Sequence, residues 1–170
     1  GLTCHTIRDI AGGDYPVIRI MPNTPCAIGK GVVQYCGLGV EEEELAEFAA
    51  LMAPAGLIDR VDEKLIDAAS AVSGCGPAYV YMYIDAMAKA GEKLGLDYET
   101  AATLAKATCR GSALLSEVSD KSLEDLRIAV CSPGGTTIEG VKSLWESDLD
   151  GVVEKALQAA YDRSVELAKN

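Results

Sequence analysis

Two glycine-containing loops hold the residues of this sequence whose types and spacing could do chemistry. The first reads Ser-Gly-Cys-Gly-Pro over residues 73–77, and the second reads Ser-Pro-Gly-Gly-Thr-Thr over residues 132–137. Each loop leads into a segment predicted to be helical, and the first turn of a helix offers backbone N–H groups that have no intrahelical partner. Because glycines let a ligand approach the backbone closely, each loop could hold a carboxylate or a phosphate.

The threonines of the second loop could also act on a ligand directly. The hydroxyl of Thr136 or Thr137 is oriented by the helix start and can donate to a polar atom of a ligand held there. The alternative interpretation is structural, because Ser, Gly and Thr before a helix are ordinary capping residues. Neither loop is a P-loop, since no Lys follows the glycines. No His and no pair of carboxylates adjoins the second loop, so any catalysis there needs little acid–base chemistry from the protein.

Six cysteines are scattered along the chain, and no two of them have the spacing of metal ligands. The single His5 cannot complete a usual zinc set, so the sequence predicts no metal site. Scattered cysteines among apolar or small residues in a chain of 170 residues are typical of reduced, buried thiols. We therefore expect a reducing compartment and a cytoplasmic protein, with disulfide formation as the alternative.

The first 62 residues show strand patterns around one helix. Short apolar runs between glycines and prolines predict strands at Val17–Met21, Gly31–Cys36 and Leu57–Val61. Acidic residues at 41–44 precede an apolar segment that ends near Met52, and acids in that place favour a helix start. The order strand–strand–helix–strand predicts the last part of an α/β domain whose beginning lies outside these residues.

From residue 63 onward the patterns are helical only, so we expect a mainly α protein. The most unusual helix is predicted over Pro77–Leu94, because its first half is apolar on nearly all sides. Such a helix is normally buried, and in a chain of this size we expect part of the cover to come from another subunit. Further helices are expected over Glu63–Val72, from Asp97 to Glu117, from Ser122 to Val130, from the second loop to Trp145, and along the C-terminal apolar stripe from Leu149 to Ser164.

The overall composition argues against two classes of partner. The net charge is −11, and an acidic surface repels both nucleic acid and anionic membranes. No stretch approaches the roughly 18 consecutive apolar residues of a membrane span. The chain begins with Gly1 rather than Met, which predicts that it is cut from a longer protein or carries added residues.

Three short strings follow one another along the chain, at Arg19–Pro25, Ser73–Tyr79 and Ser132–Ile138. In this order and at this spacing they resemble the pyrroline-5-carboxylate reductase family, and the resemblance extends over about residues 1–168. It implies an enzyme with an amino-terminal Rossmann domain and a carboxy-terminal helical domain that intertwines into a homodimer, which can assemble further. Residues 1–62 would then be a remnant of the α/β nucleotide-binding domain, and residues 63–170 the helical dimerisation and substrate-loop domain.

The same resemblance implies an activity and a set of site residues. The family reduces 1-pyrroline-5-carboxylate to L-proline with NADPH or NADH, in proline biosynthesis. It places the substrate near the second loop, at Ser132, Gly134, Gly135, Thr136 and Thr137, and gives Thr137 a hydrogen bond to the ring nitrogen. Pro22 and Asn23 would lie near the nicotinamide end of the cofactor.

Two departures from the family pattern limit what this chain is expected to do. Cys75 stands where serine is usual, and no G-x-G-x-x-G follows an early strand, so the site for the cofactor's pyrophosphate is missing. We expect the chain alone to be inactive as a reductase. A helical dimerisation module without catalysis is the first alternative function. A hydroxyacid dehydrogenase is the second, although its catalytic Lys has no counterpart before Lys89.

Overall fold

The computed structural model describes residues 2–168, which form two compact units. One unit extends to Ala78 and includes the chain from Lys155 onward, and the other spans Tyr79–Glu154. These units do not follow the predicted boundary after residue 62. They divide the chain by packing, whereas the prediction divides it by type of secondary structure, and that boundary stays a prediction.

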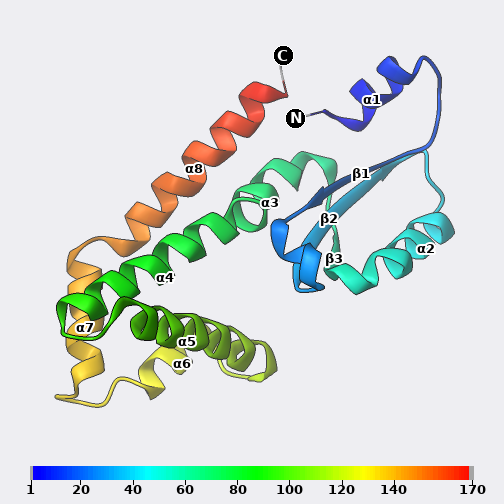
Figure 1. Ribbon diagram of the computed structural model, residues 1–170. Coiled ribbons are helices and arrows are strands. Elements are labelled where there is room, and N and C mark those ends of the chain that lie inside the picture. The colour runs from blue at the N-terminus through cyan, green and yellow to red at the C-terminus, as the bar shows by residue number, and fades with distance from the viewer. Residues whose placement is uncertain (1, 169–170) are drawn as a thin grey trace. The chain divides into compact units, whose positions relative to one another are not determined.

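The first unit is built on a three-stranded sheet of order β1-β2-β3, with helices around it (Figure 1). The central strand β2 pairs antiparallel with β1 and parallel with β3, and the helix α2 makes the crossover between the two parallel strands. The strands are β1 Val17–Pro22, β2 Gly31–Leu38 and β3 Gly56–Arg60. The predicted strand–strand–helix–strand order is therefore confirmed.

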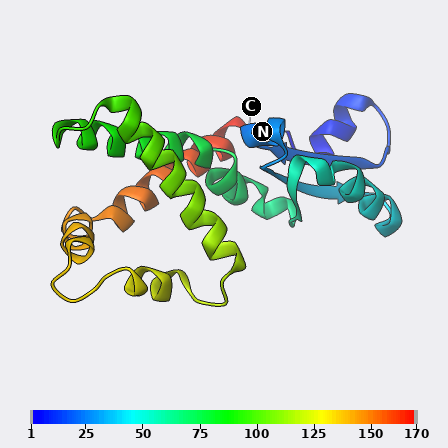
Figure 2. The same ribbon diagram turned by 60° about the horizontal axis from the view of Figure 1, so that its bottom comes forward.

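Helices make up most of the described chain, as the sequence predicts. Figure 2 shows the long helices of the second unit from another side. The α-helices are α1 Cys4–Ala11, α2 Glu42–Met52, α3 Ile66–Ser73, α4 Gly76–Lys93, α5 Tyr98–Val118, α6 Leu123–Ala129, α7 Thr136–Glu146 and α8 Leu149–Leu167. Short 3₁₀ segments lie at η1 Thr24–Ile28, η2 Ala53–Ala55 and η3 Glu63–Leu65.

Local signals explain most of the helix starts. Asp97 accepts a hydrogen bond from the Thr100 N–H at 2.8 Å, and Ser122 accepts one from the Asp125 N–H at 3.1 Å. Both are N-caps, as the sequence predicts. The helix expected from Glu63 instead begins as the 3₁₀ turn η3, and the Glu63 carboxylate accepts a hydrogen bond from the distant Cys4 N–H.

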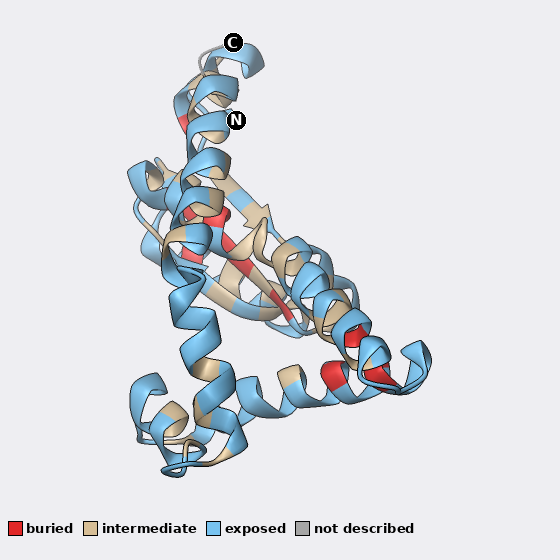
Figure 3. Cartoon of the chain, turned by 90° about the vertical axis from the view of Figure 1, so that its left-hand side faces the viewer, coloured by how far each residue is buried: buried red, intermediate tan, exposed pale blue. Residues whose placement is uncertain are grey.

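The first unit has a small core of its own. Cys4, Cys36 and Ile66 are buried together, and β2 is buried along most of its length (Figure 3). At the border of this core, Arg19 of β1 lies beside two carboxylates, those of Glu63 at 3.4 Å and Asp67 at 3.6 Å. Asp67 also accepts a hydrogen bond from Ser164 of α8 at 2.8 Å, which fixes the end of α8 against α3.

The second unit has very little core by itself. Its buried hydrophobic residues are all alanines, at Ala88, Ala101, Ala102 and Ala105, where α4 packs closely on α5. Large apolar side chains are exposed along the first half of α4, including Tyr81 at 59% and Met82 at 71%. The apolar face predicted for this helix is therefore present and left uncovered by the chain's own described residues. Within those residues, no helix combines the length and the hydropathy that a membrane crossing requires.

Candidate functional site

The second glycine loop, Ser132–Gly135, turns the chain from α6 into α7. The Gly135 N–H donates to the Ser132 carbonyl at 3.0 Å, Pro133 follows Ser132, and Gly134 has a φ of 70°. A β-turn with Pro in its second position and a positive φ in its third is of type II, and the third position favours glycine. Gly135 is needed for a different reason, because an added Cβ would collide with the Ser132 side chain.

The first turn of α7 is left open by this arrangement. Gly135 is the N-cap, so neither Thr136 nor Thr137 caps the helix, and no side chain does so. Both threonines are exposed, and their hydroxyls have no partner among residues 2–168. The first backbone N–H groups of the helix are likewise without intrahelical partners. The two threonines therefore do not cap the helix, and their role at a ligand stays a prediction.

The charge around this helix start suits a small anion only in part. Glu139 is an acid in the first turn of α7, where it would repel a carboxylate. Its side chain pairs with Lys142 one turn later at 2.8 Å, which partly offsets that charge. The remaining attraction comes from the N–H groups and the positive end of the helix dipole.

The first glycine loop, Ser73–Gly76, is built differently although its composition is similar. The N–H groups of Gly74 and Cys75 both donate to the Ser70 carbonyl, at 2.8 and 3.0 Å. The Ser73 hydroxyl donates back to the Ala69 carbonyl at 3.1 Å, so it is not an N-cap for α4. These donors are used within the protein, and the loop does not offer them to an anion.

Asn23 connects two of the three sequence strings. Its side-chain oxygen accepts from the Val32 N–H at 2.9 Å, and its side-chain nitrogen donates to the Ser73 carbonyl at 3.0 Å. The Cys26 thiol is a further donor to the same oxygen at 3.7 Å. Asn23 therefore holds the first glycine loop against the turn after β1. Pro22 is the last residue of β1, and both residues lie in the first unit.

The predicted site residues thus fall into two groups. Ser132, Gly134, Gly135, Thr136 and Thr137 lie together in one loop of the second unit, and Pro22 and Asn23 lie together in the first. The first group is open to solvent in this chain, and in the second group the Asn23 amide is largely engaged by backbone groups. The roles predicted for them are not tested by this geometry and stay predictions.

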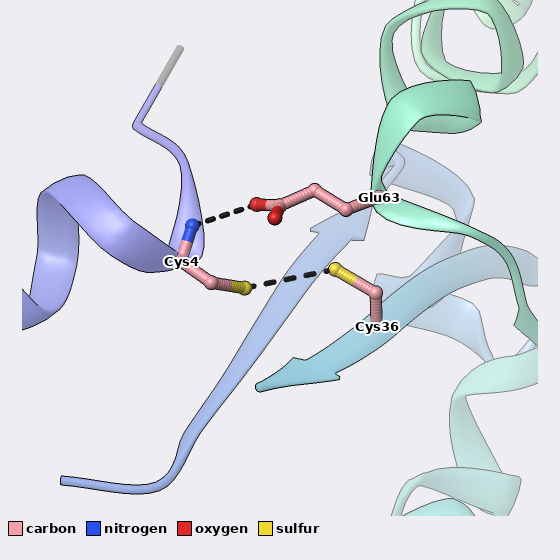
Figure 4. Close-up of side chains that lie close together, drawn as sticks. All are labelled: Cys4, Cys36 and Glu63. Carbon is pink, nitrogen blue, oxygen red and sulfur yellow. Dashed lines mark hydrogen bonds between the residues drawn. The ribbon is translucent and has the colours of Figure 1, made fainter. Parts of the chain in front are cut away.

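One cluster of potential ligands was missed by sequence reasoning. The Cys4 and Cys36 sulfurs are 3.7 Å apart, and the Glu63 carboxylate accepts from the Cys4 N–H at 2.6 Å (Figure 4). The sulfurs and a Glu63 carboxylate oxygen all lie within 4.8 Å of one another. The expectation of no metal site was based on local spacing. The two thiols are 32 residues apart in sequence and Glu63 is 59 from Cys4, so no motif could signal the cluster.

The thiols of this cluster are held in their neutral form when no cation is present. Burial, together with the neighbouring Glu63 and Cys36 side chains, raises the pKa of the Cys4 thiol to about 12. Burial also raises the pKa of Cys36. For Glu63, burial raises the pKa, but the Cys4 backbone and thiol and the Arg19 guanidinium outweigh it and hold the pKa below its usual range.

Comparisons of the sequence with a family model and with known proteins all point to one family. Residues 63–167 match the model of the pyrroline-5-carboxylate reductase dimerisation family. A pyrroline-5-carboxylate reductase of Corynebacterium melassecola is 38% identical over 100% of this chain and 63% of its own length. One of Aquifex aeolicus is 37% identical over 98% of this chain and 63% of its own length. The chain therefore spans somewhat less than two thirds of these relatives.

Solved structures show the same likeness in three dimensions. The structure of a pyrroline-5-carboxylate reductase from Coxiella burnetii superposes with a TM-score of 0.95 at 35% identity, covering 100% of this chain and 64% of that one. A pyrroline carboxylate reductase of Plasmodium falciparum with NADP bound gives a TM-score of 0.92 at 33% identity, covering 98% of this chain and 68% of that one. Both likenesses include the sheet before residue 63 as well as the helical part.

Proposed function

The chain belongs to the pyrroline-5-carboxylate reductase dimerisation family, and from this membership we propose that it is part of an enzyme that reduces 1-pyrroline-5-carboxylate to L-proline in the cytoplasm. The observation that carries the proposal is the family match over residues 63–167, and the uncapped first turn of α7, with the free hydroxyls of Thr136 and Thr137, supports the proposed place of the substrate. In the proposed division, residues 63–170 form the dimerisation and substrate-loop domain, and residues 1–62 belong to the nucleotide-binding domain.

The second loop performs the binding that such a reaction needs. The backbone N–H groups at Thr136 and Thr137 hold the substrate carboxylate, because they are unpaired donors at the positive end of a helix, and Gly135 leaves room for the substrate to approach them. The turn at Ser132 and Gly134 shapes the approach to them. Thr137 places its hydroxyl at the ring nitrogen, where it holds the proton of the imine. A protonated imine is already electrophilic, so alignment is the main requirement and no strong base is needed.

NADPH or NADH supplies a hydride when it is bound. The residues of this chain fit only its nicotinamide end, at Pro22 and Asn23, because the glycine fingerprint that cradles a pyrophosphate is absent from the sequence. The Asn23 side chain is mostly engaged with Val32 and Ser73, so its contribution is to fix the shape of this turn. We propose that the 170-residue chain alone is inactive for this reason.

The activity is tested by following NADPH oxidation in the presence of 1-pyrroline-5-carboxylate. The full-length parent protein should oxidise NADPH only when substrate is added, with L-proline as product, and the 170-residue chain should not. A parent protein without substrate-dependent oxidation would refute the reductase proposal. Activity of the short chain would refute its inactivity while leaving the reductase proposal in place.

The second candidate function is a dimerisation module, and the exposed apolar side chains of α4 favour it. We propose that a second copy of this chain covers them, since the second unit buries only alanines among its described hydrophobic residues. Light scattering should give twice the chain mass of 17.8 kDa. Met82→Glu should shift the protein to monomer, while Glu92→Gln on the same helix should not. A monomeric wild-type chain would contradict the proposal.

A further inference from the structure

We propose that Cys4, Cys36 and Glu63 form a binding site for a thiophilic divalent cation, with Zn²⁺ as the natural candidate. The site lies outside both glycine loops and is independent of the reductase proposal. It joins three separate elements, since Cys4 begins α1, Cys36 lies in β2 and Glu63 begins η3. Figure 4 shows the two sulfurs and the carboxylate converging from these elements.

The distances suit a tetrahedral ion. Two Zn–S bonds of about 2.3 Å at the tetrahedral angle place the sulfurs about 3.8 Å apart. The Cys4 and Cys36 sulfurs are 3.7 Å apart, so an ion could be held with little rearrangement. In a disulfide the same sulfurs would be about 2.05 Å apart, so both thiols are free in this structure.

The Glu63 carboxylate is available as the third ligand. Its contacts with the Cys4 N–H and with Arg19 both use Oε1, at 2.6 and 3.4 Å, and neither uses Oε2. These contacts also orient the carboxylate, in the way that hydrogen bonds from neighbouring groups orient metal ligands in known sites. The Cys4 sulfur, the Cys36 sulfur and a Glu63 oxygen all lie within 4.8 Å of one another, an upper limit that includes the separations of about 3.5–3.8 Å between ligands of one tetrahedral ion.

Ionised thiols at this site need a cation to balance their charge. Two thiolates and one carboxylate carry one more negative charge than Zn²⁺ is positive. The Arg19 guanidinium, which lies between Glu63 and Asp67, offsets part of that excess. Without an ion, two buried thiols lie against a carboxylate and must stay protonated. Thiolate ligands select Zn²⁺ or other soft ions over Mg²⁺ and Ca²⁺, which prefer oxygen.

A route to the site exists on one side. A surface hollow of about 420 Å³ is lined by Cys36, Gly37, Arg60, Val61, Asp62 and Glu63. It contacts two of the three ligands, and Cys4 lies behind them with no exposed surface. Water from this hollow can supply the fourth ligand of the ion.

The test uses cobalt, which reports thiolate ligation by colour. The 170-residue chain is purified with a non-thiol reductant and titrated with Co²⁺. One ion per chain should bind with the visible bands of tetrahedral Co²⁺ and a thiolate charge-transfer band, and one equivalent of Zn²⁺ should remove both. Two protons should be released per ion, because both thiols must ionise. A wild-type chain that shows no thiolate band overturns the proposal, whatever the variants do.

Matched variants identify the ligands. A chain with Cys26, Cys75, Cys109 and Cys131 all replaced by Ser retains the proposed pair and should keep the full spectrum. Adding Cys4→Ser or Cys36→Ser in that background should weaken binding by more than about a hundredfold, since loss of outer-shell partners alone costs up to that much. Zn²⁺ should also raise the unfolding temperature of the variant in which four cysteines are replaced. It should not raise that of the two variants that also carry Cys4→Ser or Cys36→Ser. Retention of the thiolate band after Cys36→Ser would overturn the assignment.

Discussion

The two glycine loops of this protein share a composition and differ in where their N–H groups point. At Ser73–Gly76 the N–H groups of Gly74 and Cys75 return to the Ser70 carbonyl, and Asn23 donates to the Ser73 carbonyl from the turn after β1. At Ser132–Gly135 the loop closes one β-turn and leaves the start of α7 uncapped. The first loop connects elements of the first unit, and the second leaves a helix start without a cap, where the substrate is proposed to bind.

The difference arises from what precedes each loop. The first loop continues directly from α3, so the Ser70 carbonyl near the end of that helix is within reach of the next N–H groups. The second loop follows the short helix α6 and includes Pro133, which has no N–H and cannot continue such bonding. Glycine before a helix therefore does not by itself predict a ligand site, because the neighbouring N–H groups can be bonded within the protein, as they are in the first loop.

The largest effect is expected from Thr137→Ala in the full-length enzyme. Loss of the hydroxyl proposed to hold the ring-nitrogen proton should lower turnover by more than about tenfold. The fold should be intact, because the hydroxyl has no partner among the described residues. Thr137→Ser retains the hydroxyl and should recover most of the turnover. Equal turnover of wild type and Thr137→Ala would remove Thr137 from the mechanism.

Gly74→Ala should act on stability instead. An added Cβ would lie 2.8 Å from the Ser70 hydroxyl oxygen and 2.9 Å from the Ser70 carbonyl oxygen, so the first loop would have to move away from Ser70. The free energy of unfolding should fall by about 1–3 kcal/mol, the usual cost of overpacking. Gly76→Ala is the matched control, since its Cβ would meet nothing within 4 Å. Urea unfolding measures both, and equal stability of the two variants would show that the first loop is not tightly packed.

Asn23→Asp separates the two hydrogen bonds of the Asn23 side chain, one accepted from Val32 and one donated to Ser73. The carboxylate can still accept from the Val32 N–H but cannot donate to the Ser73 carbonyl, which it would also repel. Removing that donor should reduce the free energy of unfolding by about 1–2 kcal/mol. Gln158→Glu makes the same chemical change on an exposed part of α8 and serves as the control. An effect no larger than that control would mean that the bridge contributes nothing to stability.

Local patterns in the sequence predict the elements well and the contacts between them poorly. The strands β1, β2 and β3 follow from apolar runs between glycines and prolines, and the caps Asp97 and Ser122 follow from residue type. These signals lie within a few residues of the structure that they produce. The resemblance found in three strings is likewise confirmed by the family match over residues 63–167 and by relatives that cover 98–100% of this chain.

The features that could not be predicted depend on contacts between distant segments. The bridge from Asn23 to Ser73 spans 50 residues, and the cluster of Cys4, Cys36 and Glu63 joins three elements. The opposite bonding of the two glycine loops was also hidden, because their compositions are so similar. In each case the sequence names the groups that can bond, and only the packing of the elements decides which partners they meet.

The smallest effect is expected from Gly134→Ala in the second loop. Gly134 has a φ of 70°, which costs an L-residue about 1–2 kcal/mol, but its Cβ would meet nothing within 4 Å. The loss of stability should therefore not exceed that backbone cost, whereas the substrate KM of the full-length enzyme should rise because the turn no longer aligns the α7 N–H groups. Gly140→Ala, inside α7 and also without neighbours within 4 Å, should leave KM unchanged and increase stability slightly. An unchanged KM for Gly134→Ala would mean that the turn is only a connection, and the contrast between the two loops would then rest on Thr137 alone.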